Sequence, residues 1–328
     1  MNILFTDTKI IDRGDISWSG IEGLGKLVKN PDMTRSEALK AIRETEALFV
    51  DSFSVDREMI EAAPRLRFIG AAATGFNHID IAFAQERGVA VCNVPAYSTE
   101  AVAQHAIALL LTLASRIPEY DREVSEGRWN SEAGAAYEPF PMTLLHGKSL
   151  GIVGYGNIGR RVGEIASALG MRVNVYSRDR EAAIASDVVS LHCPLTEENA
   201  RLVDAGFIEG MKEGAILINT ARGGLVDEDA LAEALKSGRL SAAGLDVMAQ
   251  EPPRPDHPLF RMKNCVITPH VAFTPLPVRQ KVVDICADNL RSFLEGGRLN
   301  RIDGAAENRS EGAAENRSED AAKNRSEE

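Results

Sequence analysis

The sequence has 328 residues, of which 44% are hydrophobic, and a formal net charge of −11. This length predicts two domains with a core each, and the negative charge argues against a nucleic-acid partner or an anionic membrane surface. The four cysteines lack C-x-x-C spacing, and the N-terminus carries Asp7 and Asp12 in place of a basic leader. We therefore expect reduced thiols in a cytoplasmic protein.

The first hundred residues alternate short apolar runs with helical patterns. The runs that predict strands are 2–5, 47–50, 66–72 and 89–94, and the segments that predict helices are 56–63 and 79–86. Such alternation is typical of a parallel sheet with helices on its faces. We expect a first α/β lobe, without a nucleotide fingerprint, over residues 1–98.

Two segments of this lobe are candidate ligand loops. Ala73, Thr74 and Gly75 follow a predicted strand, and their small side chains leave backbone N–H groups accessible to an anion. The segment 93–99 ends another strand and leads into a long helix. An ordinary strand-to-helix turn is the alternative for both, and the spacing does not separate the two.

The long apolar helix predicted at 99–117 connects the lobes. It contains Gln104 and His105, so we expect a buried helix and not a membrane span. We interpret His105 as a hydrogen-bonded core residue. The polar stretch 118–147 carries Trp129, and we expect it to wrap an interface or the rim of a cleft.

A G-x-G-x-x-G motif follows the next predicted strand and opens a helix. Gly154 permits a tight turn, Gly156 allows close approach of a pyrophosphate, and Gly159 allows the helix to pack against the strand. The first helical residues, Asn157 and Ile158, would offer free N–H groups to the phosphates. The alternative is a βαβ unit with a glycine turn and no ligand.

The end of the second strand of this lobe bears on the choice of dinucleotide. A ribose-binding carboxylate is expected about twenty residues past the glycine turn, but that position holds Ser177, followed by Arg178. Arg178 can pair with a 2′-phosphate, so we expect NAD(P)(H) with a preference for NADP(H). In the alternative, Asp179 binds the ribose and Arg178 is a solvated loop charge.

The connection after this strand is short. Ten residues separate Tyr176 from Asp187, where the next strand begins. A crossover needs at least about 10–12 residues including its helix, so the usual third strand has no room. We predict a Rossmann-type doubly wound parallel sheet that lacks its third strand and exposes an edge beside the adenine pocket, which would weaken cofactor binding.

The remaining elements are regular as far as residue 303. Strands are predicted at 187–192, 215–219, 242–246 and 265–268, and helices at 227–236 and 278–293. The last helix would return the chain to the first lobe. We expect a substrate domain of 1–98 and 291–303 and a dinucleotide-binding domain of 99–290. Residues 304–328 repeat an octapeptide, first as GAAENRSE, and we predict a disordered or partly helical tail.

Three charged residues follow strands of the second lobe. Arg222 can orient a 2-oxo acid through its carboxylate, and His270 can donate a proton to the alkoxide that hydride addition creates. Glu251 would favour the charged imidazolium of His270. Carboxyl ends of parallel strands open on one crevice, so the three could converge. Taken singly, Arg222 could equally belong to a surface ion pair, Glu251 could be a solvated loop acid, and His270 could be a hydrogen-bonded histidine at a strand end. The other histidines show no metal-ligand spacing, and we expect no metal.

These motifs together resemble the D-isomer-specific 2-hydroxyacid dehydrogenase family over about residues 45–302. The matching pieces include ATGFNHID, NVPAYSTEAVAQHAIALLL, LHGKSLGIVGYGNIG, SDVVSLHCPLT, INTARGGLVDEDAL and TPH. The first two are most similar to the glycerate dehydrogenase (hydroxypyruvate reductase) branch. The departures are Ser177-Arg178, the short connection and the repetitive tail.

The resemblance implies a flavodoxin-like substrate lobe beside the Rossmann lobe, and a homodimer. It implies Arg222, Glu251 and His270 as the catalytic set, with the substrate bound by Arg222, His270 and the backbone around Thr74-Gly75. Asp246 would hold the nicotinamide carboxamide. The other cofactor contacts that we expect at strand ends are His192, Cys193, Pro194, Thr220 and Ala221.

Four functions are compatible with these features. The leading hypothesis is reduction of hydroxypyruvate or glyoxylate to the D-2-hydroxy acid. A 3-phosphoglycerate dehydrogenase ranks lower, because no basic cluster for a phosphate is evident. A nucleotide-sensing scaffold, as among the corepressors of the family, would need no turnover. An enzyme impaired by its short connection is the fourth.

Overall fold

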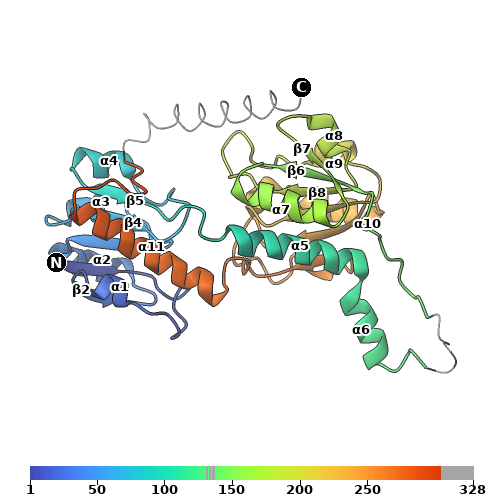
Figure 1. Ribbon diagram of the computed structural model, residues 1–328, viewed down its shortest axis with the longest axis horizontal. Coiled ribbons are helices and arrows are strands. Elements are labelled where there is room, and N and C mark those ends of the chain that lie inside the picture. Colours follow the sequence, from blue (N-terminus) through green and yellow to red (C-terminus); the bar gives the residue numbers. More distant parts are fainter. Residues whose placement is uncertain (131, 133, 135–136, 304–328) are drawn as a thin grey trace. The chain divides into compact units, whose positions relative to one another are not determined.

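The computed structural model describes residues 1–130, 132, 134 and 137–303, and the chain divides into two compact units (Figure 1). Unit 1 comprises Met1–Tyr97 and the described residues from Thr274 onward, and unit 2 comprises Ser98–Phe273. The repetitive segment 304–328, for which we predicted a disordered or partly helical tail, lies outside the described residues.

Unit 1 is built on a five-stranded parallel sheet in the order β2-β1-β3-β4-β5. Its strands are β1 (Asn2–Phe5), β2 (Lys26–Lys29), β3 (Ala47–Val50), β4 (Phe68–Ala71) and β5 (Ala90–Cys92). Its helices are α1 (Ser19–Glu22), α2 (Arg35–Ala41), the 3₁₀ turn η1 (Ile42–Glu44), α3 (Arg57–Glu61), α4 (Ile81–Glu86) and α11 (Leu276–Leu294). This strand order is that of the flavodoxin-like fold, as the family resemblance implied.

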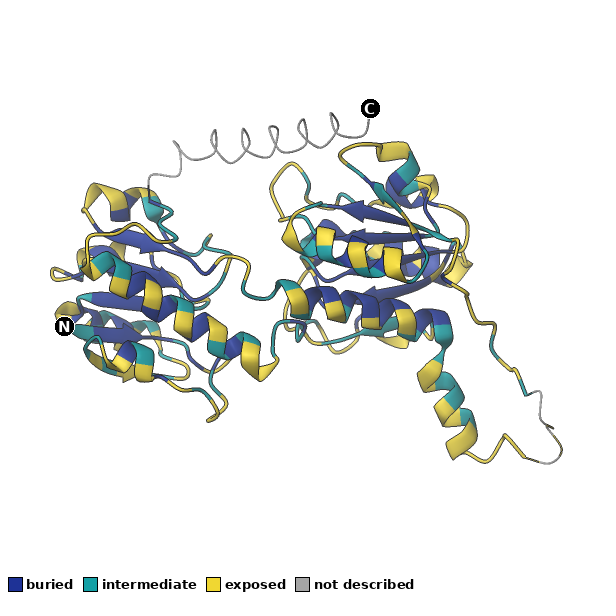
Figure 2. Ribbon diagram, in the orientation of Figure 1, coloured by how far each residue is buried: buried dark blue, intermediate teal, exposed yellow. Residues whose placement is uncertain are grey.

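Successive apolar side chains along the strands of unit 1 point to opposite faces of the sheet, and helices cover both faces. Ile3 and Phe5 of β1 pack with α1 and α11, whereas Leu4 packs with α2, α3 and α4. Figure 2 shows the strands buried and the outer faces of the helices exposed. The edge strand β2 was not anticipated, because its sequence KLVK is charged and largely exposed. Charged residues on an edge strand prevent pairing with other chains.

The domain boundary that we expected at residue 290 differs from the observed division. The whole of α11 packs in unit 1, against α1 and β4, and the ring of Phe293 lies 5.4 Å from that of Phe68. Buried residues such as Val283 and Leu290 repeat along one face of α11 over its full length. Since a helix buries one continuous face, α11 is not shared between the units.

Unit 2 is built on a six-stranded parallel sheet in the order β11-β10-β9-β8-β6-β7. Its strands are β6 (Ser149–Val153), β7 (Arg172–Val175), β8 (Val188–Leu191), β9 (Ala215–Asn219), β10 (Leu240–Leu245) and β11 (Cys265–Ile267). β8 pairs directly with β6, and β7 forms the edge. One short helix, α8 (Arg180–Ile184), fills the connection, so the prediction of a missing third strand is confirmed.

Helices cover both faces of the second sheet. Ile152 of β6 faces α5 (Thr99–Ser115) and α7 (Asn157–Ala168), and its neighbour Val153 faces α9 (Ala205–Gly210) and α10 (Glu228–Ser237). The short 3₁₀ turns are η2 (Gly223–Leu225) and η3 (Pro258–Arg261). The helix expected to reach residue 117 ends at Ser115, because Arg116 adopts a left-handed conformation and α6 (Ile117–Ser125) starts in a new direction.

Among the described helices, none alone has the length and apolar character needed to cross a membrane. α5 and α6 meet these criteria only when they are taken together, as a pair bent by 54°.

An ion pair between a buried arginine and an exposed aspartate ties the N-terminal loop of unit 1 to α11. The guanidinium of Arg279, 5% exposed, donates to both carboxylate oxygens of Asp15 at 2.8 and 2.7 Å, and to the carbonyl of Ile11. The hydrogen bond from Arg279 lowers the pKa of Asp15 to about 2. Because the folded-state pKa is depressed, this pair stabilises the fold above the ordinary pKa of an aspartate, and the contribution is lost as the pH falls towards 2.

We predict that Arg279→Met lowers the melting temperature at pH 7 by about 5 °C, because it removes the partner of Asp15 and leaves backbone carbonyls unpaired. The difference from wild type should shrink at pH 2.5. Thermal melts followed by circular dichroism measure both values. Lys281→Met, at an exposed position of the same helix, is the control. An equal difference at both pH values would contradict the assignment to Asp15.

Candidate active site

The three catalytic candidates follow three neighbouring strands of unit 2. Arg222 comes after β9, Glu251 after β10 and His270 after β11. These strands are adjacent and parallel in the sheet. Their carboxyl ends therefore lie along one edge, which is where open α/β sheets bind ligands.

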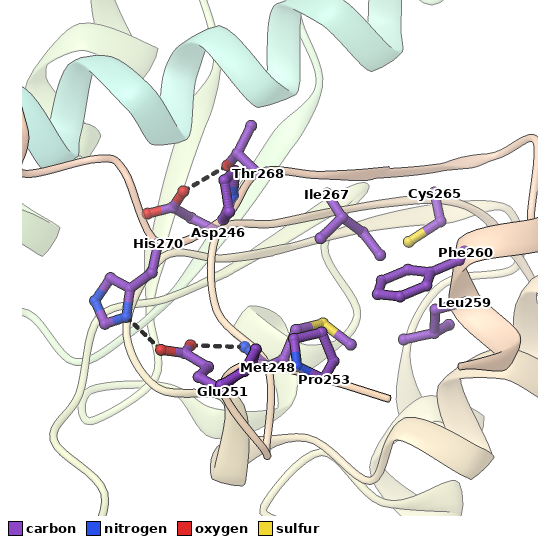
Figure 3. Close-up of a pocket in the computed structure, with 12 residues that line it drawn as sticks. Asp246, Met248, Glu251, Pro253, Leu259, Phe260, Cys265, Ile267, Thr268 and His270 are labelled. Atoms are coloured by element: carbon purple, nitrogen blue, oxygen red, sulfur yellow. Dashed lines mark hydrogen bonds and ion pairs between the residues drawn. The ribbon is translucent and has the colours of Figure 1, made fainter. Parts of the chain in front are cut away.

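Glu251 and His270 form a hydrogen-bonded pair. Nδ1 of His270 lies 2.7 Å from Oε2 of Glu251, whose Oε1 accepts from the backbone N–H of Met248 at 3.0 Å (Figure 3). Burial raises the pKa of Glu251, but the bonds from His270 and Met248 outweigh it and the pKa is lowered. An ionised carboxylate only accepts hydrogen bonds, so Nδ1 carries a proton and Nε2 is left to face a substrate.

The backbone of His270 is strained. Its φ of 51° is left-handed, a conformation that costs a residue with a Cβ atom roughly 1 kcal/mol or more. The N–H of His270 donates to the carbonyl of Asp246 at 2.7 Å. Backbone strain of this kind is common at active sites, where the surrounding hydrogen bonds hold a side chain in the orientation that its function requires.

Asp246 anchors the segment that carries His270. Its side chain is 1% exposed, and its carboxylate accepts from the hydroxyl of Thr268 and from the N–H groups of Val271 and Ala272, at 3.0 and 2.9 Å. Burial raises the pKa of Asp246, but these bonds and one from His105 lower it overall. The carboxylate is therefore ionised and largely satisfied within the chain.

Arg222 lies on the turn beside the loop of Glu251. Its guanidinium donates to the carbonyl of Ala221 at 2.7 Å and is exposed. The next residue, Gly223, lies so close to the 248–249 backbone that a Cβ atom would come within 1.9 Å of the carbonyl carbon of Met248. Only glycine permits this approach, which brings the Arg222 turn against the loop that leads to Glu251.

A pocket of about 650 Å³ opens beside the His270–Glu251 pair (Figure 3). Its other walls are mostly apolar and come from Met248, Pro253, Leu259, Phe260 and Ile267. The described residues contain no group of three or more metal-ligating side chains.

The glycine turn fits a dinucleotide pyrophosphate. Gly156 precedes α7, and no side chain caps this helix, so its first N–H groups are available to an anion. Asn157 and Ile158 open the helix, as expected. Gly154 has a φ of 96°. A Cβ atom at Gly159 would come within 2.1 Å of the carbonyl oxygen of Gly154. The sequence interpretation of these two glycines agrees with the packing.

Two strand ends beside the turn carry buried polar atoms that lack a partner. Nδ1 of His192, after β8, and Oγ1 of Thr220, after β9, have no hydrogen-bond partner in the described structure. Burial lowers the pKa of His192 to about 4 and raises that of Cys193, so both are neutral. Buried polar groups normally find partners, and a dinucleotide bound along this edge would supply them.

The end of β7 presents a guanidinium to the glycine turn. The guanidinium of Arg178 lies 5.4 Å from the ring centre of Tyr155, and Ser177 is exposed beside it. The carboxylate of Asp179 caps α8 by accepting from the N–H of Ala182 at 3.0 Å. Asp179 is therefore committed in part to the helix, which disfavours the alternative in which it binds the ribose.

We predict that Gly156→Ala weakens cofactor binding about tenfold without altering the melting temperature. A Cβ atom there would meet no protein atom within 4 Å, so it would intrude only on a ligand. Gly159→Ala should instead lower the melting temperature, because its Cβ atom would strike the carbonyl of Gly154. Fluorescence titration with NADPH and thermal melts measure the two effects. Equal losses of stability in both variants would refute the distinction.

Comparison with known proteins identifies relatives along most of the chain. Residues 107–272 match the family described as D-isomer specific 2-hydroxyacid dehydrogenase, NAD binding domain. A hydroxypyruvate reductase of Blautia hydrogenotrophica is 37% identical over 321 residues, covering 92% of this chain and 100% of that protein. A D-3-phosphoglycerate dehydrogenase of Archaeoglobus fulgidus is 40% identical over 281 residues, which cover 80% of this chain and 52% of that protein.

A solved structure resembles both units. It is an NADPH-dependent glyoxylate/hydroxypyruvate reductase of Sinorhizobium meliloti, in complex with NADP and malonate. The TM-score is 0.75 at 27% identity, and the match covers 92% of this chain and 96% of that one.

Proposed function

Because the chain belongs to the D-isomer specific 2-hydroxyacid dehydrogenase family, whose members are NAD(P)-dependent oxidoreductases acting on CH–OH groups, we propose that it reduces hydroxypyruvate or glyoxylate to the D-2-hydroxy acid. The observation that carries the proposal is the His270–Glu251 pair, at 2.7 Å, on the edge that also holds Arg222. The relative named hydroxypyruvate reductase, matched over its whole length, supports this substrate class.

The residues divide the work of the reaction. When bound, the nicotinamide supplies or accepts the hydride. Reduction places negative charge on the carbonyl oxygen of the 2-oxo acid, and Nε2 of His270 gives that oxygen its proton. Glu251 keeps the ring oriented through its hydrogen bond with Nδ1 until then. Arg222 pairs with the substrate carboxylate through its planar fork, and Asp246 turns its remaining acceptor capacity to the carboxamide of the nicotinamide.

We propose that the loop after β4 in unit 1 binds the substrate carboxylate through the backbone of Ala73, Thr74 and Gly75. The hydroxyl of Thr74 donates to the carbonyl of Val94 at 2.9 Å, and the amide of Asn93 donates to the carbonyl of Thr74 at 2.9 Å. These bonds tie the loop to the end of β5. A loop fixed in this way presents its N–H groups to an anion without further ordering.

We predict that His270→Ala and Arg222→Ala each lower kcat/KM by a factor of about 10²–10⁴, because the proton donor or the carboxylate clamp is lost. NADPH affinity should stay within about twofold of wild type, since the glycine turn is untouched. Spectrophotometric turnover with hydroxypyruvate, glyoxylate, pyruvate and phosphohydroxypyruvate tests the substrate class. A wild-type rate in either variant would show that the substituted residue does not take part in the reaction. No turnover of any 2-oxo acid by the wild type would favour a nucleotide-sensing scaffold or an impaired enzyme.

We propose NADPH as the preferred hydride donor. Three features of the β7 end support it: Ser177 bears no charge to repel a 2′-phosphate, Arg178 lies at the glycine turn, and Asp179 caps α8. The missing third strand leaves this end at the edge of the sheet. The adenine side of the cofactor is therefore less enclosed than in a complete Rossmann sheet, and we expect a correspondingly weaker affinity.

We predict that Arg178→Ala raises the KM for NADPH about tenfold, because one bidentate phosphate contact is lost, while the KM for NADH changes by less than about twofold. Arg180→Ala is the matched control, since the guanidinium of Arg180 lies over Tyr176 and not at the glycine turn. Initial rates with both cofactors provide the measurement. A wild-type enzyme that prefers NADH would overturn the proposal.

The alternative of a phosphoglycerate dehydrogenase is supported by the D-3-phosphoglycerate dehydrogenase relative, of which this chain spans about half the length. Turnover of phosphohydroxypyruvate above that of hydroxypyruvate would favour it. On the family resemblance alone, we also propose that the protein works as a homodimer. From the cysteines without C-x-x-C spacing we propose a location in the cytoplasm.

A further inference from the structure

His105 is bonded to the segment that carries His270. It lies on α5, and its Nε2 atom is 2.8 Å from Oγ1 of Thr268 and 3.4 Å from Oδ1 of Asp246. We propose that His105 is a positioning residue: together with Thr268 and Asp246 it holds His270 in its left-handed backbone conformation, with Nδ1 against Glu251. This inference rests on the proposed role of His270 as proton donor.

The directions of these hydrogen bonds follow from the chemistry of the groups. Asp246 is ionised and can only accept, so the single hydroxyl proton of Thr268 goes to Asp246. The oxygen of Thr268 therefore acts as an acceptor towards His105. Nε2 of His105 must then carry a proton and donate this hydrogen bond. His105 is thus the first donor of a chain that ends at the carboxylate of Asp246.

Asp246 transmits this constraint to His270. Its side chain accepts from the N–H groups of Val271 and Ala272, and its carbonyl accepts from the N–H of His270 at 2.7 Å. The backbone on both sides of His270 is therefore bonded to one residue. If Thr268 no longer donated its hydroxyl proton to Asp246, the carboxylate of Asp246 could rotate, and the bonds at residues 271 and 272 would weaken with it.

The strained φ of His270 makes this network necessary. A histidine at a φ of 51° relaxes to a right-handed or extended conformation unless other bonds oppose it. Relaxation would swing the imidazole away from Glu251, to which it is bonded at 2.7 Å. Among the described residues, Glu251 and Asp246 are the carboxylates that contact the two histidines, and Arg222 lies on the neighbouring turn. The pocket beside His270 also contains the thiol of Cys265.

Substitutions at the two ends of the chain test the proposal. His105→Phe removes the donor and keeps an aromatic ring, His105→Gln retains an N–H donor, and Thr268→Val removes the hydroxyl at nearly constant volume. Gln104→Ala, at an exposed position of the same helix, is the control. We expect His105→Phe and Thr268→Val to lower kcat about tenfold, with the KM for hydroxypyruvate within about twofold, and His105→Gln to restore most of the rate.

Two further readouts separate positioning from general destabilisation. The basic limb of the kcat/KM profile should move to lower pH in His105→Phe and Thr268→Val, because His270 loses its contact with Glu251. The double variant should be no slower than either single one, since both break the same chain. Wild-type kcat and pH profile in His105→Phe, or additive losses in the double variant, would overturn the inference.

An NMR measurement answers the question independently of turnover. The Cε1–Hε1 signal of the His270 ring, observed in the cofactor-free protein, should shift in His105→Phe and Thr268→Val and stay in place in Gln104→Ala. An unchanged signal in both variants would refute the network even if the enzyme reduces hydroxypyruvate. A shifted signal in a protein that turns over no 2-oxo acid would support the network and reject the proposed function.

Discussion

The carboxylate and backbone of Asp246 join the strand ends on which the candidate active site of unit 2 depends. The N–H of Asp246 donates to the carbonyl of Asn219 at the end of β9, and its carbonyl accepts from His270 beyond β11. Its side chain binds three further groups of the segment 268–272. A buried carboxylate that accepts several hydrogen bonds holds its donors rigidly, whereas one without partners would destabilise these strand ends. This arrangement makes the edge a stable support for a strained histidine.

The β7 edge of the same sheet shows how the short connection between β7 and β8 is accommodated in a Rossmann-type unit. α8 packs so closely on β6 that a Cβ atom at Gly151 would come within 2.0 Å of the carbonyl oxygen of Ala183. Asn174 of β7 donates to the carbonyl of Ala182 and to the hydroxyl of Ser186, which fastens the short helix to the edge strand. The sheet thus tolerates the loss of a strand because the lost strand is an edge. The consequence that we propose concerns the adenine side of the cofactor and not the strand ends of β9, β10 and β11.

Much of the fold could be predicted because it rests on local patterns. The alternation of apolar runs and helical segments identified two parallel α/β units, and the ten residues between Tyr176 and Asp187 excluded a third strand by length alone. The charged edge strand β2 was not predicted, because its residues do not alternate between apolar and polar as those of a half-buried strand do. The domain boundary near α11 was misplaced, because an amphipathic helix shows that it has a buried face but not which sheet buries it.

By itself, the sequence determined the residue types and their places after the strands: a G-x-G-x-x-G turn between a strand and a helix, and Arg222, Glu251 and His270 each beyond a strand end. Parallel strands put their carboxyl ends on one edge, so this much followed from chain order and chemistry. Only the tertiary structure decided that His270 is left-handed, that its Nδ1 meets Glu251, and that His105 on a distant helix is bonded to the same segment. Those contacts join residues far apart in the chain, and no local periodicity records which buried polar groups will be partners.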